Sequence, residues 1–259
     1  MRLFRPGVFV FAIFGAAAGC ATGTPAGQDK PDAKIITVAD APIGTPDSPI
    51  GTPDAKLGSP DAPPAQPVTI TLSQAASTSI VALNSVSCNA ANVTAENSYY
   101  RAFPLSDFGI TSPFTVQSVT YAVESADAEI GTSQGVQVRV YNYTGTVGAA
   151  TLDTASMTQL GGVASTVPNT TTGTNITANL AATVPAGGTV VAEIFVPDGD
   201  PDGNGIGNAF FLGSNASGES RPGYIRAPDC GSPTPTSFAS LGLATTVDIV
   251  VSVTGTYIP

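Results

Sequence analysis

Residues 247–254 read Val-Asp-Ile-Val-Val-Ser-Val-Thr, and residues 136–141 read Val-Gln-Val-Arg-Val-Tyr. In both stretches aliphatic side chains occupy every second position, with mostly polar side chains between them. A period of two is typical of a β-strand that buries one face and exposes the other. The two stretches therefore predict strands.

The same alternation recurs through residues 68–259, between clusters of turn residues. No window in this region has a convincing helical period. The aliphatic positions change phase between Val116 and Val119, which predicts a β-bulge at 117–118. Further strands are predicted over 68–72, 79–83, 99–103, 175–184, 189–196 and 209–212.

Around ten short strands with one wet face predict an all-β domain made of two packed antiparallel sheets. A β-sandwich of the jelly-roll or immunoglobulin-like kind agrees with the pattern better than a closed barrel. The period alone does not distinguish these sandwich types.

Composition excludes several classes of function. The 259 residues carry 9 Lys and Arg against 19 Asp and Glu, a net charge of -10, and there is no His. An acidic chain does not bind nucleic acid through a basic patch. Without His there is no Ser-His or Cys-His nucleophile and no His general base. The chain is therefore predicted not to be an enzyme.

The first 19 residues predict an export signal. Arg2 and Arg5 precede an apolar run of 11 residues (8–18), which is too short to span a bilayer. The run ends in Ala17-Ala18-Gly19-Cys20, which resembles the lipobox of bacterial lipoproteins. The alternative is an ordinary secretory signal followed by a chance cysteine.

The lipobox resemblance implies cleavage before Cys20 and acylation of this residue, for example with palmitate. The lipid bilayer is then a partner of the chain through Cys20. Residue 21 is Ala rather than Asp. By resemblance to sorting in Gram-negative bacteria, this favours the outer membrane.

Residues 20–67 predict a disordered tether after the lipidated cysteine. They contain six Asp, three Lys and no aromatic residue, and a seven-residue repeat begins at positions 42, 49 and 56. Such a segment buries too little apolar surface to fold. The alternative is a segment that binds the cell wall or a partner. The folded domain is predicted at 68–259.

If Cys20 carries lipid, Cys88 and Cys230 remain as the other cysteines. An exported protein meets an oxidising environment, so these two cysteines are predicted to form a disulfide.

Three segments of the domain resemble parts of a domain found in other exported proteins. Residues 96–103 (Glu-Asn-Ser-Tyr-Tyr-Arg-Ala-Phe), 108–111 and 210–218 are similar to parts of an uncharacterised β-sandwich domain of exported bacterial proteins. The resemblance implies a sandwich fold and supplies no catalytic residues.

Asp198, Asp200 and Asp202 occupy alternate positions before Gly203, and Asn204 follows. Carboxylates spaced in this way surround Ca²⁺ in tight loops. The stretch resembles the calcium loops of EF-hands, dockerins and thrombospondin type 3 repeats. It predicts a calcium site with ligands Asp198, Asp200, Asp202 and Asn204. The alternative is an acidic turn that binds no metal.

Two further constellations suggest ligand sites. Arg139, Tyr141 and Tyr143 share the polar phase of their strand, as a sugar-binding surface requires, although cross-strand pairing also explains them. Acidic residues could serve a glycosidase, with solvent-facing acids as the alternative. These acids are Glu124, Asp127, Glu129 and Glu193.

The sequence thus predicts a membrane-anchored lipoprotein of the cell envelope that displays a non-catalytic interaction or structural module. Its partner is an unknown envelope protein or glycan. The alternatives are a carbohydrate-binding module and a glycoside hydrolase that uses carboxylates.

Overall fold

The computed structural model of the protein describes residues 64–90, 92–243 and 247–259. The predicted signal peptide (1–19), the predicted lipidation site Cys20 and residues 21–63 of the predicted tether lie outside them. From Pro64 to Pro259 the chain forms one compact unit. In this described part, no helix has both the length and the apolar character needed to cross a membrane.

Two large antiparallel sheets make up most of this unit. The five-stranded sheet has the order β1-β15-β5-β10, and β8 also pairs with β5. The six-stranded sheet has the order β13-β12-β4-β9-β6-β7. The strands of the first are β1 (Val68–Ser73), β5 (Phe114–Asp127), β8 (Thr174–Val184), β10 (Ala209–Leu212) and β15 (Val251–Tyr257). Those of the second are β4 (Asn97–Pro104), β6 (Ser133–Tyr143), β7 (Met157–Pro168), β9 (Thr189–Val196), β12 (Gly223–Ala227) and β13 (Ser232–Ser237).

Small elements connect the large sheets. Two strand pairs are formed by β2 (Asn89–Ala90) with β3 (Val93–Thr94) and by β11 (Ser214–Asn215) with β14 (Asp248–Ile249). Three short 3-10 helices are η1 (Leu105–Phe108), η2 (Thr154–Ser156) and η3 (Pro228–Cys230).

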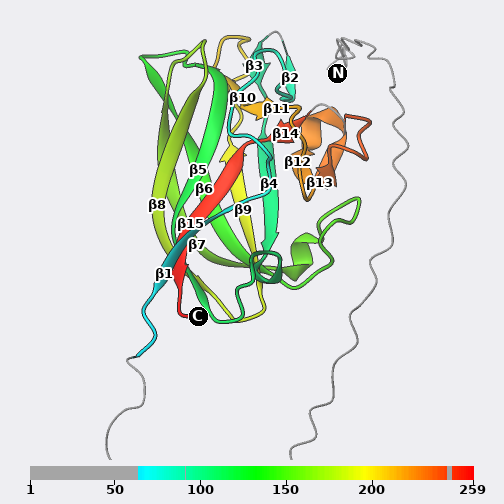
Figure 1. Ribbon diagram of the computed structural model, residues 1–259. Coiled ribbons are helices and arrows are strands. Elements are labelled where there is room, and N and C mark those ends of the chain that lie inside the picture. Colours follow the sequence, from blue (N-terminus) through cyan, green and yellow to red (C-terminus); the bar gives the residue numbers. More distant parts are fainter. Residues whose placement is uncertain (1–63, 91, 244–246) are drawn as a thin grey trace, which may run out of the picture. The chain divides into compact units, whose positions relative to one another are not determined.

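The two large sheets lie face to face, as Figure 1 shows, and their inner faces share one hydrophobic core. Val136, Val138 and Val140 enter this core from β6, and Val119 and Tyr121 enter it from β5. Antiparallel sheets packed in this way form a β-sandwich. The predicted all-β sandwich is therefore confirmed.

The predicted bulge lies in β5. Ser118 pairs with Thr254 of β15, Val116 pairs with Gly255, and Gln117 between them has no partner in that ladder. The extra residue lets Val116 and Val119, three positions apart, face the same core.

Residues 79–83, predicted as a strand, form none: 79–81 are irregular and 82–83 lie in a turn. Leu83 has a φ of 62°, in the left-handed region. The carboxylate of Glu124 accepts the N–H of Leu83 at 2.6 Å and the N–H of Ser85 at 3.0 Å. A strand ladder requires these N–H groups, and a side chain of β5 binds them instead.

Three strands of the large sheets were not predicted from the sequence, and neither were the two-residue strands β2, β3 and β11. β7 contains Gly161 and Gly162, and β13 contains Pro233 and Pro235. Such residues weaken the strand pattern. Pairing with β6 and with β12 nevertheless keeps both segments extended. The third missed strand, β12, has only five residues.

The run 247–254 contains two strands, β14 and β15, with Val250 between them. Asp248 belongs to the polar phase, yet only 3% of it is exposed. Asp248 pairs with Asn215 of β11, and the chain that follows β11 covers it. The carboxylate of Asp248 accepts the N–H of Gly218 at 2.7 Å.

The outer face of the five-stranded sheet is neutral and rich in hydroxyl groups. Three rows of paired residues cross β1, β15, β5 and β8. The rows are Thr69-Thr256-Thr115-Thr183, Thr71-Thr254-Ser118-Asn179 and Ser73-Ser252-Thr120-Thr177. The hydroxyl groups of Thr71 and Thr254 lie 2.8 Å apart. Such cross-strand pairs stabilise a solvated sheet face.

Cys88 and Cys230 form the predicted disulfide, with their Cα atoms 5.9 Å apart and a sequence separation of 142. Cys88 is buried just before β2, and Cys230 ends η3. The bridge ties the connection between β1 and β2 to the loop after β12.

Candidate functional site

The candidates on β6 lie on the outer face of the six-stranded sheet. Arg139 and Tyr141 are half-buried, whereas Tyr143 is 3% exposed. A buried ring cannot stack on a ligand from solvent, so Arg139 and Tyr141 are the accessible members. Tyr143 belongs to a second, small core that also contains Tyr100, Ala102, Leu152, Val191 and Tyr224.

A buried carboxylate organises this face. The strand register places Glu193 of β9 directly between Arg139 of β6 and Tyr100 of β4. Glu193 is 3% exposed. Its Oε1 accepts the hydroxyl of Tyr100 at 2.9 Å. Its Oε2 accepts the hydroxyl of Tyr141 at 2.5 Å and Nη1 of Arg139 at 3.3 Å. These four residues are the Glu193 cluster.

Burial and the carboxylate of Glu193 shift the pKa values of Tyr100, Arg139 and Tyr141. Desolvation raises the pKa of Tyr141, and its hydrogen bond to Glu193 raises it further. Desolvation and the charge of Glu193 raise the pKa of Tyr100 in the same way. Desolvation acts to lower the pKa of Arg139, but the charges around it, Glu193 first, outweigh this and raise it. Both tyrosines therefore stay protonated and Arg139 stays charged at physiological pH.

The Glu193 cluster presents a fixed cation beside an aromatic hydroxyl. The guanidinium of Arg139 lies 4.4 Å from the ring centre of Phe195, a cation–π contact. With Glu193 on one side and Phe195 beneath, Arg139 has few rotamers available. The arrangement suits hydrogen bonding to a polar ligand. Glu193 itself is buried under its three donors and is not accessible to a substrate.

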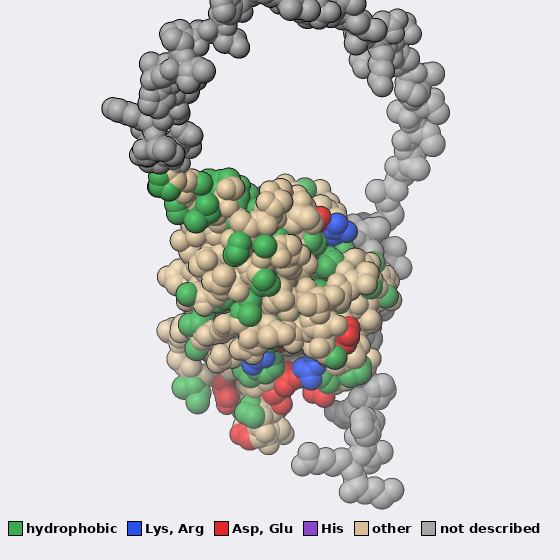
Figure 2. Space-filling model, turned by 90° about the horizontal axis from the view of Figure 1, so that it is seen from below, with side chains coloured by type: hydrophobic (Ala, Val, Ile, Leu, Met, Phe, Trp, Pro, Cys, Tyr) green, Lys and Arg blue, Asp and Glu red, His purple; other side chains and the backbone are tan. Residues whose placement is uncertain are grey.

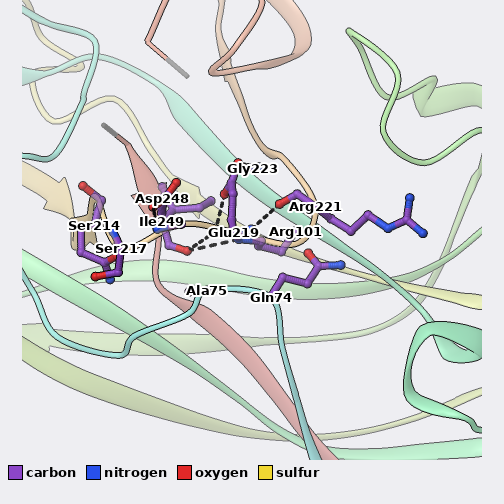
Figure 3. Close-up of polar contacts among 12 residues, drawn as sticks. Gln74, Ala75, Arg101, Ser214, Ser217, Glu219, Arg221, Gly223, Asp248 and Ile249 are labelled. Carbon is purple, nitrogen blue, oxygen red and sulfur yellow. Dashed lines mark hydrogen bonds and ion pairs between the residues drawn. The ribbon is translucent and has the colours of Figure 1, made fainter. Parts of the chain in front are cut away.

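A second buried network joins β4 to β14 and the segment after β11 (Figure 3). Arg101 of β4 is fully buried. Its Nε and Nη2 donate to the carbonyl of Ile249 at 3.1 and 2.6 Å, and its Nη1 donates to the carbonyl of Arg221 at 2.7 Å. Oε2 of Glu219 lies 2.8 Å from Nη2. Because this oxygen accepts no well-directed hydrogen bond, the contact is an ion pair by distance alone.

Two carboxylates surround this single arginine. Desolvation raises the pKa of Glu219, the charge of Arg101 opposes the rise, and the charge of Asp248 adds to it. Desolvation likewise lowers the pKa of Arg101. Glu219 also accepts the N–H of Gly223 at 3.3 Å. Arg101 is inaccessible and the side chain of Glu219 is 17% exposed, so the network serves mainly to connect the elements around it.

Sequence reasoning missed Arg101 and its partners. One signal was present, because Arg101 follows two tyrosines in β4 and precedes Ala102 and Phe103. A charge in such a strand needs a buried partner. The identity of the partners was not visible, because Glu219 and Asp248 lie far along the chain.

The predicted calcium ligands lie on the exposed loop between β9 and β10. Asp200 accepts the N–H of Gly205 at 2.7 Å and of Asn204 at 3.0 Å, and the first of these bonds is the main cause that lowers its pKa. Asp198 accepts the N–H of Asp200, and Asp202 accepts that of Asn204. Among the described residues no three His, Cys, Asp or Glu side chains form a group that could hold a metal ion. This geometry favours the turn, and calcium binding stays a prediction.

Glu193 is separated from the other acids considered for a glycosidase, which lie at one end of β5 and in the loop that follows it. Glu193 lies on the outer face of the six-stranded sheet. Glu124 lies on the other side of the sandwich, where it binds the N–H groups of the turn at 83–85. Asp127 accepts the side-chain amide of Asn169 at 3.0 Å. Glu193 and Glu124 therefore cannot flank one scissile bond.

Comparisons with known proteins give little further information. No protein-family model and no curated protein matches the chain. Its structure is similar to part of the cysteine protease and lectin-like domains of Cwp84, a surface layer associated protein of Clostridium difficile. The identity is 14% and the TM-score 0.40, with 64% of this chain and 33% of that chain covered. This likeness carries no conclusion about function.

Proposed function

We propose that the protein is a cell-envelope lipoprotein, anchored through acylated Cys20, whose β-sandwich is a non-catalytic interaction or structural module. The observation that carries the proposal is the Cys88–Cys230 disulfide. Disulfides of this kind persist in oxidising compartments outside the cytosol. The bridge agrees with the export signal predicted at 1–19.

The polar side chains of the domain support a non-catalytic role. All four arginines of the described residues are paired with carboxylates. A shallow hollow of about 290 Å³ lies where β1 begins, between Pro67, Pro113, Tyr257 and Ile258. Its lining, all within the described residues, includes no carboxylate and no arginine that could transfer a proton or stabilise charge.

The anchor is tested with the full-length protein in a Gram-negative host. Mass spectrometry should identify acylated Cys20 as the first residue, and Cys20→Ala should move the protein to the soluble fraction. Ala21→Asp is the matched control, which should keep the lipid and shift the protein to the inner membrane. A wild-type product that begins elsewhere and carries no lipid contradicts the proposal.

Carbohydrate binding is the second candidate, and the half-exposed pair Arg139 and Tyr141 favours it. The Glu193 cluster holds both side chains in place, which lowers the entropy cost of binding a polar ligand. A glycan array probed with the full-length protein tests this function. Sugar binding should be lost in Tyr141→Ala and kept in Gln137→Ala, an exposed position of the same strand. Binding that survives Tyr141→Ala contradicts this site.

A further inference from the structure

Three loops form the end of the sandwich that lies opposite the start of β1. The register defines the two ends, because Val68 and Phe114 both pair with Tyr257, whereas Asp127 at the other end of β5 pairs with Ala209. Three loops lie at the Asp127 end: the turn 81–85, the connection 128–132 and the connection 197–208. These loops are the distal loop surface.

The distal loop surface carries the most exposed large aliphatic side chains of the described residues. Leu83, Ile130 and Ile206 are 97%, 83% and 64% exposed, and each lies on a different loop. Exposing three large apolar side chains to water is unfavourable. A partner that buries them releases the water around them, which favours binding.

The loops hold these side chains in place. Glu124 fixes Leu83 through two backbone N–H groups, at 83 and 85. Oδ1 of Asn208 accepts the N–H of Glu129 at 2.9 Å and thereby joins the loops of Ile130 and Ile206. A surface that is already ordered loses little entropy on binding.

The same end carries most of the carboxylates that have no arginine partner. Between 64 and 259 the chain has thirteen Asp and Glu and four Arg, and each Arg pairs with a different carboxylate. Nine carboxylates therefore have no arginine partner. Six of these nine lie in the distal loops or at the adjoining end of β5: Glu124, Asp127, Glu129, Asp198, Asp200 and Asp202.

The other surfaces formed by the described residues lack this combination. Away from Glu124, the outer face of the five-stranded sheet is neutral and covered with hydroxyl groups. Seen from below, most of the domain shows uncharged side chains and backbone with hydrophobic side chains between them, and the charged side chains gather mainly along the lower edge of the view (Figure 2). The outer face of the six-stranded sheet is partly covered by its own second core.

We infer that the distal loop surface is a docking site for a basic segment of another protein, whose aliphatic or aromatic side chains cover Leu83, Ile130 and Ile206. This inference rests on the proposed function. Charge complementarity identifies the partner, because six carboxylates attract lysine and arginine and repel a second copy of this end or an anionic membrane. The chain enters at the opposite end, so these loops point away from the tether's attachment.

The test uses the full-length protein and a phage-displayed library of random short peptides as the probe. Enriched peptides should combine Lys or Arg with aliphatic or aromatic residues, and their binding should weaken as salt rises. The variant Leu83→Ser, Ile130→Ser, Ile206→Ser should bind roughly tenfold more weakly or worse. The matched control is Val68→Ser with Ile258→Ser, exposed aliphatic side chains at the other end, which should bind like the wild type.

A second variant covers the case in which the triple variant does not fold, as judged by its melting curve. Glu129→Gln with Asp202→Asn should weaken binding and reduce its salt dependence. Peptides that bind all variants equally contradict docking at the distal loop surface but remain consistent with the proposed interaction module. A library that enriches no peptide overturns both. Vesicles of phosphatidylcholine that compete with the peptides identify a lipid surface instead and overturn the inference.

Discussion

At the scale of single residues, the buried charges Arg101 and Glu193 both obtain partners from other strands. Arg101 of β4 uses the carbonyl of Ile249 from β14, and Glu193 of β9 uses hydroxyl groups from β4 and β6. Leaving a buried charge without a partner strongly destabilises the folded state. A slip of one residue in the strand register turns these side chains to the wrong face, so the buried charges help to specify the register.

Glu219→Gln is expected to change the pH dependence of stability. Desolvation raises the pKa of Glu219, Arg101 opposes the rise and Asp248 adds to it. The stability contributed by this group is therefore full below its unfolded pKa and is lost as pH rises through the folded value. The Gln variant lacks that loss, so the Tm of the wild type minus that of the variant should decrease from about pH 4 to about pH 8.

Thermal melts of both proteins across this range measure the effect. Thr69→Ser, a neutral change on the exposed face, is the control and should keep a constant Tm difference. A difference for Glu219→Gln that is constant or increases with pH contradicts the assignment.

At the scale of elements, the bulge in β5 depends on a close approach by β15. Gly255 lies opposite Val116, next to the unpaired Gln117. A Cβ at Gly255 would lie 2.5 Å from the ring of Phe114 and would also meet the carbonyl of Thr115. The register shift therefore requires glycine at this position.

Gly255→Ala is expected to destabilise the fold by about 1–3 kcal/mol, because the new methyl group overpacks the core against Phe114. Urea unfolding measures the change. Gly135→Ala is the matched control, since this glycine lies on an exposed position of β6 with no atom within 4 Å of the added Cβ. Equal effects at the two positions would argue against the close approach.

The loop 197–208 is the element on which the calcium prediction depends. If that prediction holds, calcium raises the Tm of the wild type above its value in chelator, because a cation relieves the repulsion between carboxylates. Asp200→Ala with Asp202→Ala should abolish the increase, whereas Asp153→Ala, on another loop, should keep it. Melting curves that coincide in calcium and chelator leave the loop as a turn.

At the scale of the whole molecule, the disulfide connects segments that no strand pair joins. Cys88 lies in the connection before β2, and Cys230 lies between β12 and β13. Cross-linking residues separated by 142 positions restricts the unfolded chain far more than the folded one.

Cys88→Ala with Cys230→Ala is expected to lower the free energy of unfolding by at most about 5 kcal/mol. Urea unfolding of the full-length protein measures the loss. A reducing agent should lower the midpoint of the wild type and leave that of the variant unchanged. A wild-type midpoint that does not respond to reduction would mean that the bridge adds no stability.

The sequence alone determined the all-β class, the bulge at Gln117 and the pairing of Cys88 with Cys230. Each depends on a local period, or on the number of cysteines together with the lipobox resemblance at Cys20, which can be seen without a fold. Only the tertiary structure decided the irregular course of residues 79–83, the strands β7, β12 and β13, and the partners of Arg101 and Glu193. These features depend on which distant strands lie side by side and in which register. An alternating pattern predicts that a side chain turns inward, but the chain's topology determines what it meets there.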